Sequence, residues 1–301
     1  MSPAAAPETD GRDTQGFLEG AGGRRIFWQS WGAGASPRAV IVIVHGASEH
    51  SDRYDYVAGA LVAGGYAVYA SDHRGHGRSD GPRAVIDRLD NAVADLDQLV
   101  LLARDRHPVA PVYMLGHSMG ATVALAYTLG HQRRLAGLIL SGALAALAAA
   151  PAPLRLAGRL LSAIAPNTPL VAIDAALVSR DPDVVSAYAS DPLVHHGKLP
   201  ARTVAELATA VEGFPSAVGA ITLPTLILYG TADRLCPPAG SEMLGERIGA
   251  ADKTVNTYDG LYHEILNEPE RDDVLADIRE WLQARVDAAA IAPSSKRQPV
   301  K

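Results

Sequence analysis

The sequence of 301 residues has a single cysteine, few aromatic residues and no long uninterrupted apolar run. That cysteine, Cys236, cannot form an internal disulfide, and a zinc cluster built on cysteine ligands is excluded. A membrane-spanning helix would need roughly 18 to 20 apolar residues in a row, which the chain does not have. Apolar residues still make up 48% of the sequence, which is enough for one large core or two smaller ones.

The chain also has no excess of positive over negative charge. Lysine and arginine number 27 against 33 aspartates and glutamates, a net charge of −6 that argues against general attraction to nucleic acid. Residues 1–15 lack the basic start and apolar stretch of a signal peptide, and both they and residues 289–301 are predicted to be disordered tails. We therefore expect a cytoplasmic protein, and nothing in the sequence indicates an oligomeric state.

Predicted strands and helices alternate along most of the chain. Residues 39–44 form a continuous β-branched run, which is typical of a strand buried on both faces of a parallel sheet. Residues 89–105 have apolar side chains at spacings of three or four, which predicts an amphipathic helix. After a hairpin in 17–31, further strands are expected at 66–71, 112–115, 135–140, 225–229 and 254–258, and further helices at about 52–63, 119–130, 240–248 and 268–286. This order predicts an α/β protein with a mostly parallel, doubly wound sheet.

Residues 143–220 interrupt the alternation. From 143 to 173 the only charged residues are Arg155 and Arg159, and Pro151, Pro153 and Pro166 divide the stretch into short pieces. A Pro/Ala-rich linker is one interpretation, but helical spacing of the large apolar residues favours helices; these are Leu154, Leu156, Leu160, Leu161 and Ile164. We expect a core of 16–142 and 221–288, with a mostly helical cap over the carboxyl ends of the strands, where ligands bind in open α/β sheets.

A candidate nucleophile stands between a predicted strand and a predicted helix. The pentapeptide Gly116-His-Ser-Met-Gly120 fits the G-x-S-x-G nucleophile elbow, in which a strained turn exposes the hydroxyl of Ser118. The flanking glycines let strand and helix approach closely, and the helix N-terminus supplies partial positive charge near a forming oxyanion. The pentapeptide alone is weak evidence, but this context predicts the α/β-hydrolase fold.

Serine needs a base, and in this fold the chain order is serine, acid, histidine. His263 follows the last predicted strand, where a loop would return it to the edge of the sheet. Asp233 follows strand 225–229 and is the expected acid. Asp72 also ends a strand, but it precedes Ser118 and lies in a Gly/Arg-rich turn, which favours a structural role.

Two backbone N–H groups are expected to form the oxyanion hole. Met119 follows the nucleophile, and Ala47 lies just after the first buried parallel strand, where the second donor belongs. His45 would then be a packing and hydrogen-bonding residue. A zinc site at His73-x-x-His76 or at His195-His196 is not expected, since neither pair has the nearby carboxylate residues or the helical spacing that zinc sites use.

Together these motifs resemble the monoacylglycerol lipases, particularly the bacterial and mycobacterial members, over roughly residues 16–282. The resemblance is carried by His45-Gly-Ala-Ser-Glu-His-Ser-Asp-Arg-Tyr54, Asp72-His-Arg-Gly-His-Gly-Arg-Ser79, the elbow, Gly230-Thr-Ala-Asp-Arg-Leu-Cys-Pro237, Tyr258-Asp-Gly-Leu-Tyr-His263, and the cap segments Ser179-Arg-Asp-Pro-Asp183 and Tyr188-Ala-Ser-Asp-Pro-Leu-Val-His-His196. Ser48 and Ala121 stand where many members have glycine, and because both are small we expect little effect.

The resemblance implies cofactor-free hydrolysis of monoacylglycerols to glycerol and fatty acid. It also implies that Glu49 and Arg53 shape the polar, glycerol end of the pocket. From the residues alone, this pair at a spacing of four could hold a polar floor or form a solvated salt bridge of little value. A lysophospholipase, a general carboxylesterase, a thioesterase or a binding protein without turnover remain alternatives.

Two further expectations concern the surroundings of the site. Cys236 lies three residues after Asp233, so its thiol is expected close to the nucleophile or buried as a small hydrophobic group. The nearly uncharged stretch 143–173 would touch the membranes or micelles that hold a lipid ester, with Arg155 and Arg159 meeting anionic head groups. We therefore expect peripheral, reversible membrane contact through the cap.

Overall fold

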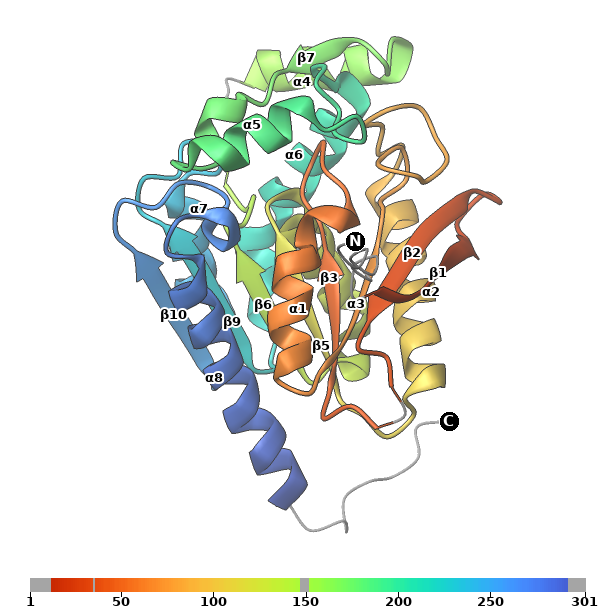
Figure 1. Ribbon diagram of the computed structural model, residues 1–301. Helices are drawn as coiled ribbons and strands as arrows, with labels where there is room; N and C mark the ends of the chain where they lie inside the picture. Colours follow the sequence, from red (N-terminus) through yellow and green to blue (C-terminus); the bar gives the residue numbers. More distant parts are fainter. Residues whose placement is uncertain (1–11, 35, 147–151, 292–301) are drawn as a thin grey trace, which may run out of the picture.

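The computed structural model describes residues 12–34, 36–146 and 152–291 and is built on an eight-stranded sheet (Figure 1). The order of its strands is β1-β2-β4-β3-β5-β6-β9-β10. They are β1 (Arg12–Glu19), β2 (Arg25–Trp31), β4 (Ala67–Ser71), β3 (Val40–Val44), β5 (Val112–His117), β6 (Gly137–Ser141), β9 (Thr225–Gly230) and β10 (Lys253–Tyr258). Strand β2 pairs antiparallel with β1 and β4, and all other neighbours are parallel. The predicted fold class, an α/β-hydrolase fold with a mostly parallel sheet, is confirmed.

Helices cover both faces of the sheet, which explains the unbroken apolar strands. In β3, Val40, Val42 and Val44 belong to one buried cluster, while Ile41 and Ile43 belong to another. The first cluster includes α2 (Leu89–Arg106), α3 (Met119–His131) and α7 (Pro238–Arg247); the second includes α1 (Asp55–Ala63) and α8 (Arg271–Ile291). Alternate side chains of one strand therefore enter two different cores.

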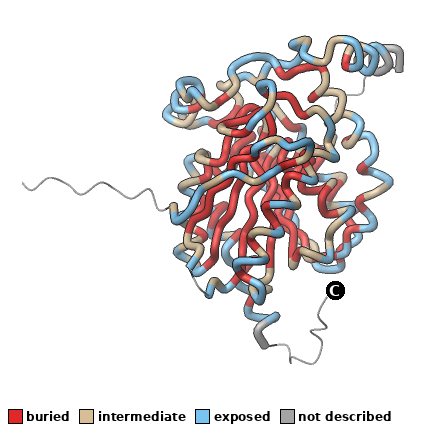
Figure 2. The backbone as a smooth tube through the Cα atoms, turned by 90° about the vertical axis from the view of Figure 1, so that its right-hand side faces the viewer, coloured by how far each residue is buried: buried red, intermediate tan, exposed pale blue. Residues whose placement is uncertain are grey.

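A separate layer lies above the carboxyl ends of the strands (Figure 1), and it is formed by the segment of the chain that connects β6 to β9. It contains α4 (Ala152–Ile164), β7 (Pro169–Val171), α5 (Pro182–Ser190), β8 (Leu199–Pro200) and α6 (Ala201–Ala217). The helical cap expected at 143–220 is refined in two ways. Strands β7 and β8 form a small antiparallel sheet, and α6 descends so that Leu207, Val211 and Phe214 enter the main core. Figure 2 shows the resulting contrast between buried strands and a largely exposed cap.

The boundaries of the two predicted tails were misplaced. Strand β1 begins at Arg12, so residues 12–15 belong to the sheet; Arg12 also donates to Asp55 from its guanidinium. At the other end, α8 continues to Ile291, past the expected limit of 288. Residues 1–11 and 292–301 lie outside the described part of the chain.

The start of α8 was also predicted too early. The helix begins at Arg271, because Glu268 is extended (φ −75°, ψ 163°), as residues before proline usually are. Pro269 therefore precedes the helix and does not occupy its first turn. Within the described ranges, no helix is long and apolar enough to cross a bilayer.

Candidate functional site

Ser118 occupies a strained turn between β5 and α3. Its φ of 55° and ψ of −123° place it in a region that non-glycine residues rarely adopt. The Ser118 N–H donates to the carbonyl of Ser141 on the neighbouring strand (3.0 Å), which holds the turn against the sheet. The sequence Gly116–Gly120 therefore forms the sharp strand-to-helix turn that the motif predicts.

The glycines of this turn permit close packing. A Cβ on Gly120 would collide with the backbone carbonyls of Val44 and His45, and a Cβ on Gly116 would lie 2.8 Å from Cα of Ala121. Strand β3 can therefore approach the start of α3 only because position 120 carries no side chain. This close approach brings the loop after β3 beside Ser118, where a Cβ on Gly46 would lie 3.1 Å from Cβ of the serine.

His263 and Asp233 meet in the loops after β10 and β9. Their Nδ1 and Oδ2 atoms are 2.8 Å apart, and both residues are buried. The other carboxylate oxygen of Asp233 accepts the N–H groups of Leu235 and Cys236, each at 2.9 Å. Burial lowers the pKa of His263, but its hydrogen bond to Asp233 and the charge of that carboxylate outweigh this and raise the pKa above its usual value.

Asp72, the competing aspartate, points elsewhere. Its carboxylate accepts the N–H and hydroxyl of Ser51, at 2.8 and 2.6 Å, and the N–H of Arg78 at 2.8 Å. These bonds join the loops after β3 and β4. The imidazole of His263 thus contacts the carboxylate of Asp233, whereas the carboxylate of Asp72 binds backbone N–H groups of two loops.

The two expected oxyanion donors lie at the same cavity as Ser118. Ala47 and Met119 both line it, and Met119 is the first residue of α3, where helix N–H groups lack partners within the helix. The loop carrying Ala47 is held by the carboxylate of Glu49, which accepts the N–H of Gly46. His45 is fully buried beneath it, and its Nε2 accepts the N–H of His73 at 2.8 Å.

Glu49 and Arg53 form a buried ion-pair network with a third residue, Glu264. Arg53 donates to Glu49 at 2.8 Å and to both oxygens of Glu264 at 2.7 Å, and the hydroxyl of Tyr54 donates to Glu49 at 2.9 Å. The solvated salt bridge is ruled out, since the three charged side chains are at most 10% exposed. The ring of Tyr188, from the cap, covers the Arg53 guanidinium at 4.7 Å.

The two carboxylates of this network titrate differently. Burial raises the pKa of Glu264, but the charge of Arg53 and its hydrogen bonds outweigh this and lower the value to about 2. Burial raises the pKa of Glu49, and the charge of Arg53 offsets only part of that effect. Two carboxylates thus share one guanidinium, and Glu264 is the one that ionises first.

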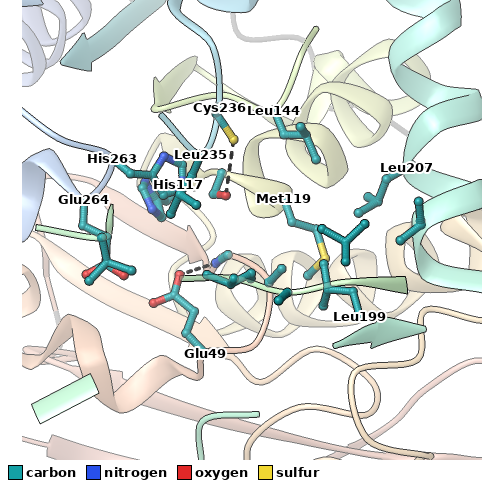
Figure 3. Close-up of a pocket in the computed structure, with 18 of the residues that line it drawn as sticks. Glu49, His117, Met119, Leu144, Leu199, Leu207, Leu235, Cys236, His263 and Glu264 are labelled. Carbon is teal, nitrogen blue, oxygen red and sulfur yellow. Dashed lines mark hydrogen bonds between the residues drawn. The ribbon is translucent and has the colours of Figure 1, made fainter. Parts of the chain in front are cut away.

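Glu49, Glu264 and Tyr188 line a cavity of about 200 Å³ between core and cap. Figure 3 shows the carboxylates of Glu49 and Glu264 on the side of His263 and His117, and Leu199 and Leu207 at the opposite end. The apolar end is lined by Leu144, Leu199, Val204, Leu207 and Ala208 from the loop after β6, from β8 and from α6. Ser118, Ala47 and His263 line the same cavity, so the site has a polar end and an apolar end.

Cys236 satisfies both expectations for its thiol. Its Sγ lies 3.8 Å from Oγ of Ser118, and the residue is only 6% exposed (Figure 3). Burial, followed by the negative charge of Asp233, raises the pKa of the thiol well above its usual range. The thiol is therefore a neutral group in the wall of the cavity.

Three buried histidines, His45, His73 and His76, pack against one another. Burial, together with the charge of neighbouring histidines, lowers the pKa of His73 to about 3 and that of His76 to about 4. His45 packs against both rings, at 4.4 and 5.5 Å between centroids. Over the described ranges, no group of three or more histidine, cysteine or acidic residues could hold a metal ion.

Sequence reasoning missed the position of Glu264 and two of its neighbours. Glu264 is not among the site residues predicted from the sequence, although its place directly after His263 was a usable signal. Its partner Arg53 is 211 positions away, and the Tyr188 ring comes from a separate cap helix. His117, the second residue of the elbow, packs on His263 with ring centroids 4.7 Å apart.

Comparison with known proteins places the chain in a family. The family described as "Serine aminopeptidase, S33" matches residues 35–270. The monoacylglycerol lipase of Mycolicibacterium smegmatis is 42% identical over 264 residues, covering 87% of this chain and 94% of that protein. The monoglyceride lipase of Rattus norvegicus is 36% identical over 292 residues, 96% of each chain. The crystal structure of the Paleococcus ferrophilus monoacylglycerol lipase has a TM-score of 0.78 at 30% identity and covers 86% of this chain and 99% of that one.

Proposed function

Because this chain belongs to the family described as serine aminopeptidase, S33, and has the α/β-hydrolase fold, we propose that it hydrolyses monoacylglycerols to glycerol and fatty acid. The observation that carries the proposal is the divided polarity of the cavity. Monoacylglycerol has a long apolar chain and a small polar alcohol joined by one ester. The leucine-lined end fits the chain, the network of Glu49 and Arg53 fits the glycerol, and Ser118 lines the same cavity.

In the proposed reaction Ser118 is the nucleophile. Its Oγ attacks the ester carbonyl while Nε2 of His263 takes the hydroxyl proton, and Asp233 holds the imidazole in the required tautomer. The N–H groups of Ala47 and Met119 bind the negative oxygen. The bond to glycerol then breaks, His263 returns the proton to the departing oxygen, and water repeats the sequence to release the fatty acid and restore Ser118.

We assign Glu49 and Arg53 to the polar floor under the glycerol. Among the described residues, the Glu49 carboxylate accepts hydrogen bonds from the N–H of Gly46, the hydroxyl of Tyr54 and the guanidinium of Arg53. Glu49 therefore has two tasks in this proposal: it holds the loop that carries Ala47, and it presents a carboxylate edge to the alcohol. Both tasks follow from a single buried side chain at the polar end of the cavity.

The cap is the proposed contact with membranes or micelles. Four of the large apolar side chains exposed on the described surface lie there: Leu160 (57%), Ile164 (81%), Leu170 (38%) and Val171 (46%). Val171 also lines the cavity, so one of these exposed side chains lies at the substrate site. Arg159 pairs with Glu212 at 2.9 Å, and the side chain of Arg155 lies outside the described residues, so apolar contact carries this proposal more than charge does.

A substrate panel tests the function. It should contain mono-, di- and triacylglycerols, lysophospholipids and acyl-CoA of one chain length, with an aminoacyl anilide added because of the family description. We expect the highest kcat/KM with monoacylglycerol, a covalent fluorophosphonate adduct on the wild type and none on Ser118→Ala. A preference for lysophospholipid, acyl-CoA or simple esters would favour the alternative hydrolases, and absence of the adduct from the wild type would favour a binding protein.

A further inference from the structure

The polar end of the cavity has two carboxyl groups, and both pair with one guanidinium. Glu49 and Glu264 are 3% and 6% exposed, and the only guanidinium between them belongs to Arg53. None of the described residues that line the cavity is a lysine or an arginine. When both carboxyl groups are ionised, one negative charge is therefore uncompensated where the alcohol part of an ester would lie.

Arg53 is poorly placed to bind an anion. One terminal nitrogen donates to Glu49 and Glu264, the other donates to Glu264, and Tyr188 covers the plane of the guanidinium at 4.7 Å. A phosphate would have to displace a buried carboxylate to reach it. Removing one partner of such a pair leaves an unpaired buried charge, which is strongly unfavourable.

Of the two carboxylates, Glu264 is the better candidate for the group that sets the charge at the alcohol end of the cavity. Glu49 also holds Gly46 and Tyr54, so its removal would disturb the loop carrying Ala47. Glu264 accepts from Arg53 and from Asn267 (2.9 Å), directly follows His263 and lines the cavity. Its carboxylate meets the alcohol side of the site without holding the oxyanion loop.

We propose that Glu264 is a specificity-determining residue that selects uncharged leaving alcohols and rejects anionic ones such as glycerol phosphates. The inference rests on the proposed function, since it assumes that the alcohol lies at the polar end. A phosphate entering this end meets a like charge in a poorly solvated site, where the repulsion is weakly screened. Glycerol brings hydroxyl groups only and can donate to the same carboxylates.

The test compares three decanoyl esters at pH 8: decanoylglycerol, the same ester carrying a 3-phosphate, and a decanoyl ester of diglycerol as a neutral control for size. We expect wild-type kcat/KM to be lower for the phosphate ester by about 30-fold or more, equivalent to about 2 kcal/mol. The diglycerol ester should be cleaved nearly as well as decanoylglycerol. In Glu264→Gln the ratio of phosphate to neutral ester should rise about tenfold, whatever the absolute rate.

The matched control is Glu242→Gln, which removes one negative charge from an exposed site on α7 and should leave the ratio unchanged. Equal wild-type rates on phosphate and neutral esters, or an unchanged ratio in a folded Glu264→Gln variant, would overturn the inference. Failure of the wild type on decanoylglycerol together with cleavage of simple esters would instead count against the proposed function.

A second measurement needs no variant. The acyl-enzyme formed from p-nitrophenyl decanoate is offered glycerol or glycerol 3-phosphate in place of water. In acyl transfer the alcohol oxygen bonds to the acyl carbon, the bond to Oγ of Ser118 breaks, and the alcohol proton passes through His263 to Oγ. We expect decanoylglycerol from glycerol and at least about 30-fold less transfer to the phosphate, for the same electrostatic reason. Equal transfer to both would contradict selection by charge.

Discussion

Nδ1 of His263 lies 2.8 Å from Oδ2 of Asp233, although the two residues are 30 positions apart and follow different strands. The contact depends on Gly230 at the end of β9, where a Cβ would lie 2.7 Å from the carbonyl oxygen of Tyr262. The end of one strand thus touches the loop that follows the other. Because both loops leave the carboxyl edge of the sheet, Asp233 and His263 lie at the same edge as Ser118.

Asp233→Asn is expected to lower kcat by about 10³- to 10⁴-fold with little change in the melting temperature, because the amide would favour the wrong tautomer of His263. Asp72→Asn is the matched control. It should lower the melting temperature while kcat falls far less, since Asp72 holds the backbone N–H groups of Ser51 and Arg78. Steady-state kinetics and thermal unfolding of both variants measure this, and the reverse pattern would reassign the acid.

The pH profile should have an acid limb above pH 6.5. Only neutral His263 can accept the Ser118 proton, so acylation is lost as the pH falls through its raised pKa. In Asp233→Asn the residual activity should show this limb at lower pH, because the opposing effect of burial then dominates. Burst-phase acylation by a p-nitrophenyl ester between pH 5 and 9 measures the acid limb of the wild type and that of the variant. A flat wild-type profile would contradict His263 as the base.

Cys236 is predicted to be unnecessary for the chemistry but sensitive to bulky reagents. Maleimide should inhibit the wild type slowly, since burial keeps the thiol protonated, and should leave an active Cys236→Ala variant unaffected. The adduct would stand 3.8 Å from the nucleophile and fill the cavity. Rate loss is followed together with the mass of the intact protein. Equal inhibition of Cys236→Ala would place the effect at some other residue.

Replacing Leu160 and Ile164 with serine should weaken binding to lipid vesicles and raise KM for long-chain monoacylglycerol severalfold. Turnover of a short water-soluble ester should change much less, because the triad is untouched. Val109→Ser is the control, since Val109 is 85% exposed and lies beyond α2, outside the cap. Vesicle sedimentation at several salt concentrations measures binding. A folded double variant that binds vesicles like the wild type would refute the membrane contact.

Ser48→Gly should raise the free energy of unfolding by about 1 kcal/mol, although the two residues differ little in size. Ser48 has a φ of 68°, which costs a non-glycine residue about 1 to 2 kcal/mol, and among the described residues its buried hydroxyl is one of those without a partner. The extra chain entropy of glycine, about 0.4 to 1 kcal/mol, offsets part of this gain. Urea unfolding measures it, with Ser48→Ala as the control that removes the hydroxyl and keeps the strain. Destabilisation by glycine would show that the turn is not strained.

Local sequence by itself determined the sheet, the elbow and the identity of the triad candidates. Strand β3 could be recognised because a run buried on both faces is apolar at every position, and Ser118 because its flanking glycines are required within five residues. The expected positions of Ala47 and Asp233 follow from the same rule that loops after parallel strands gather at one edge.

Only the tertiary structure decided how that edge is charged and covered. Arg53 and Glu264 are brought together across 211 positions, and Tyr188 reaches them from a cap helix, so no local pattern encodes their contact. The raised pKa of His263 likewise depends on burial and on Asp233 at once. Periodicity reports which side of an element is apolar, but the ionisation of a buried group depends on which distant charges surround it.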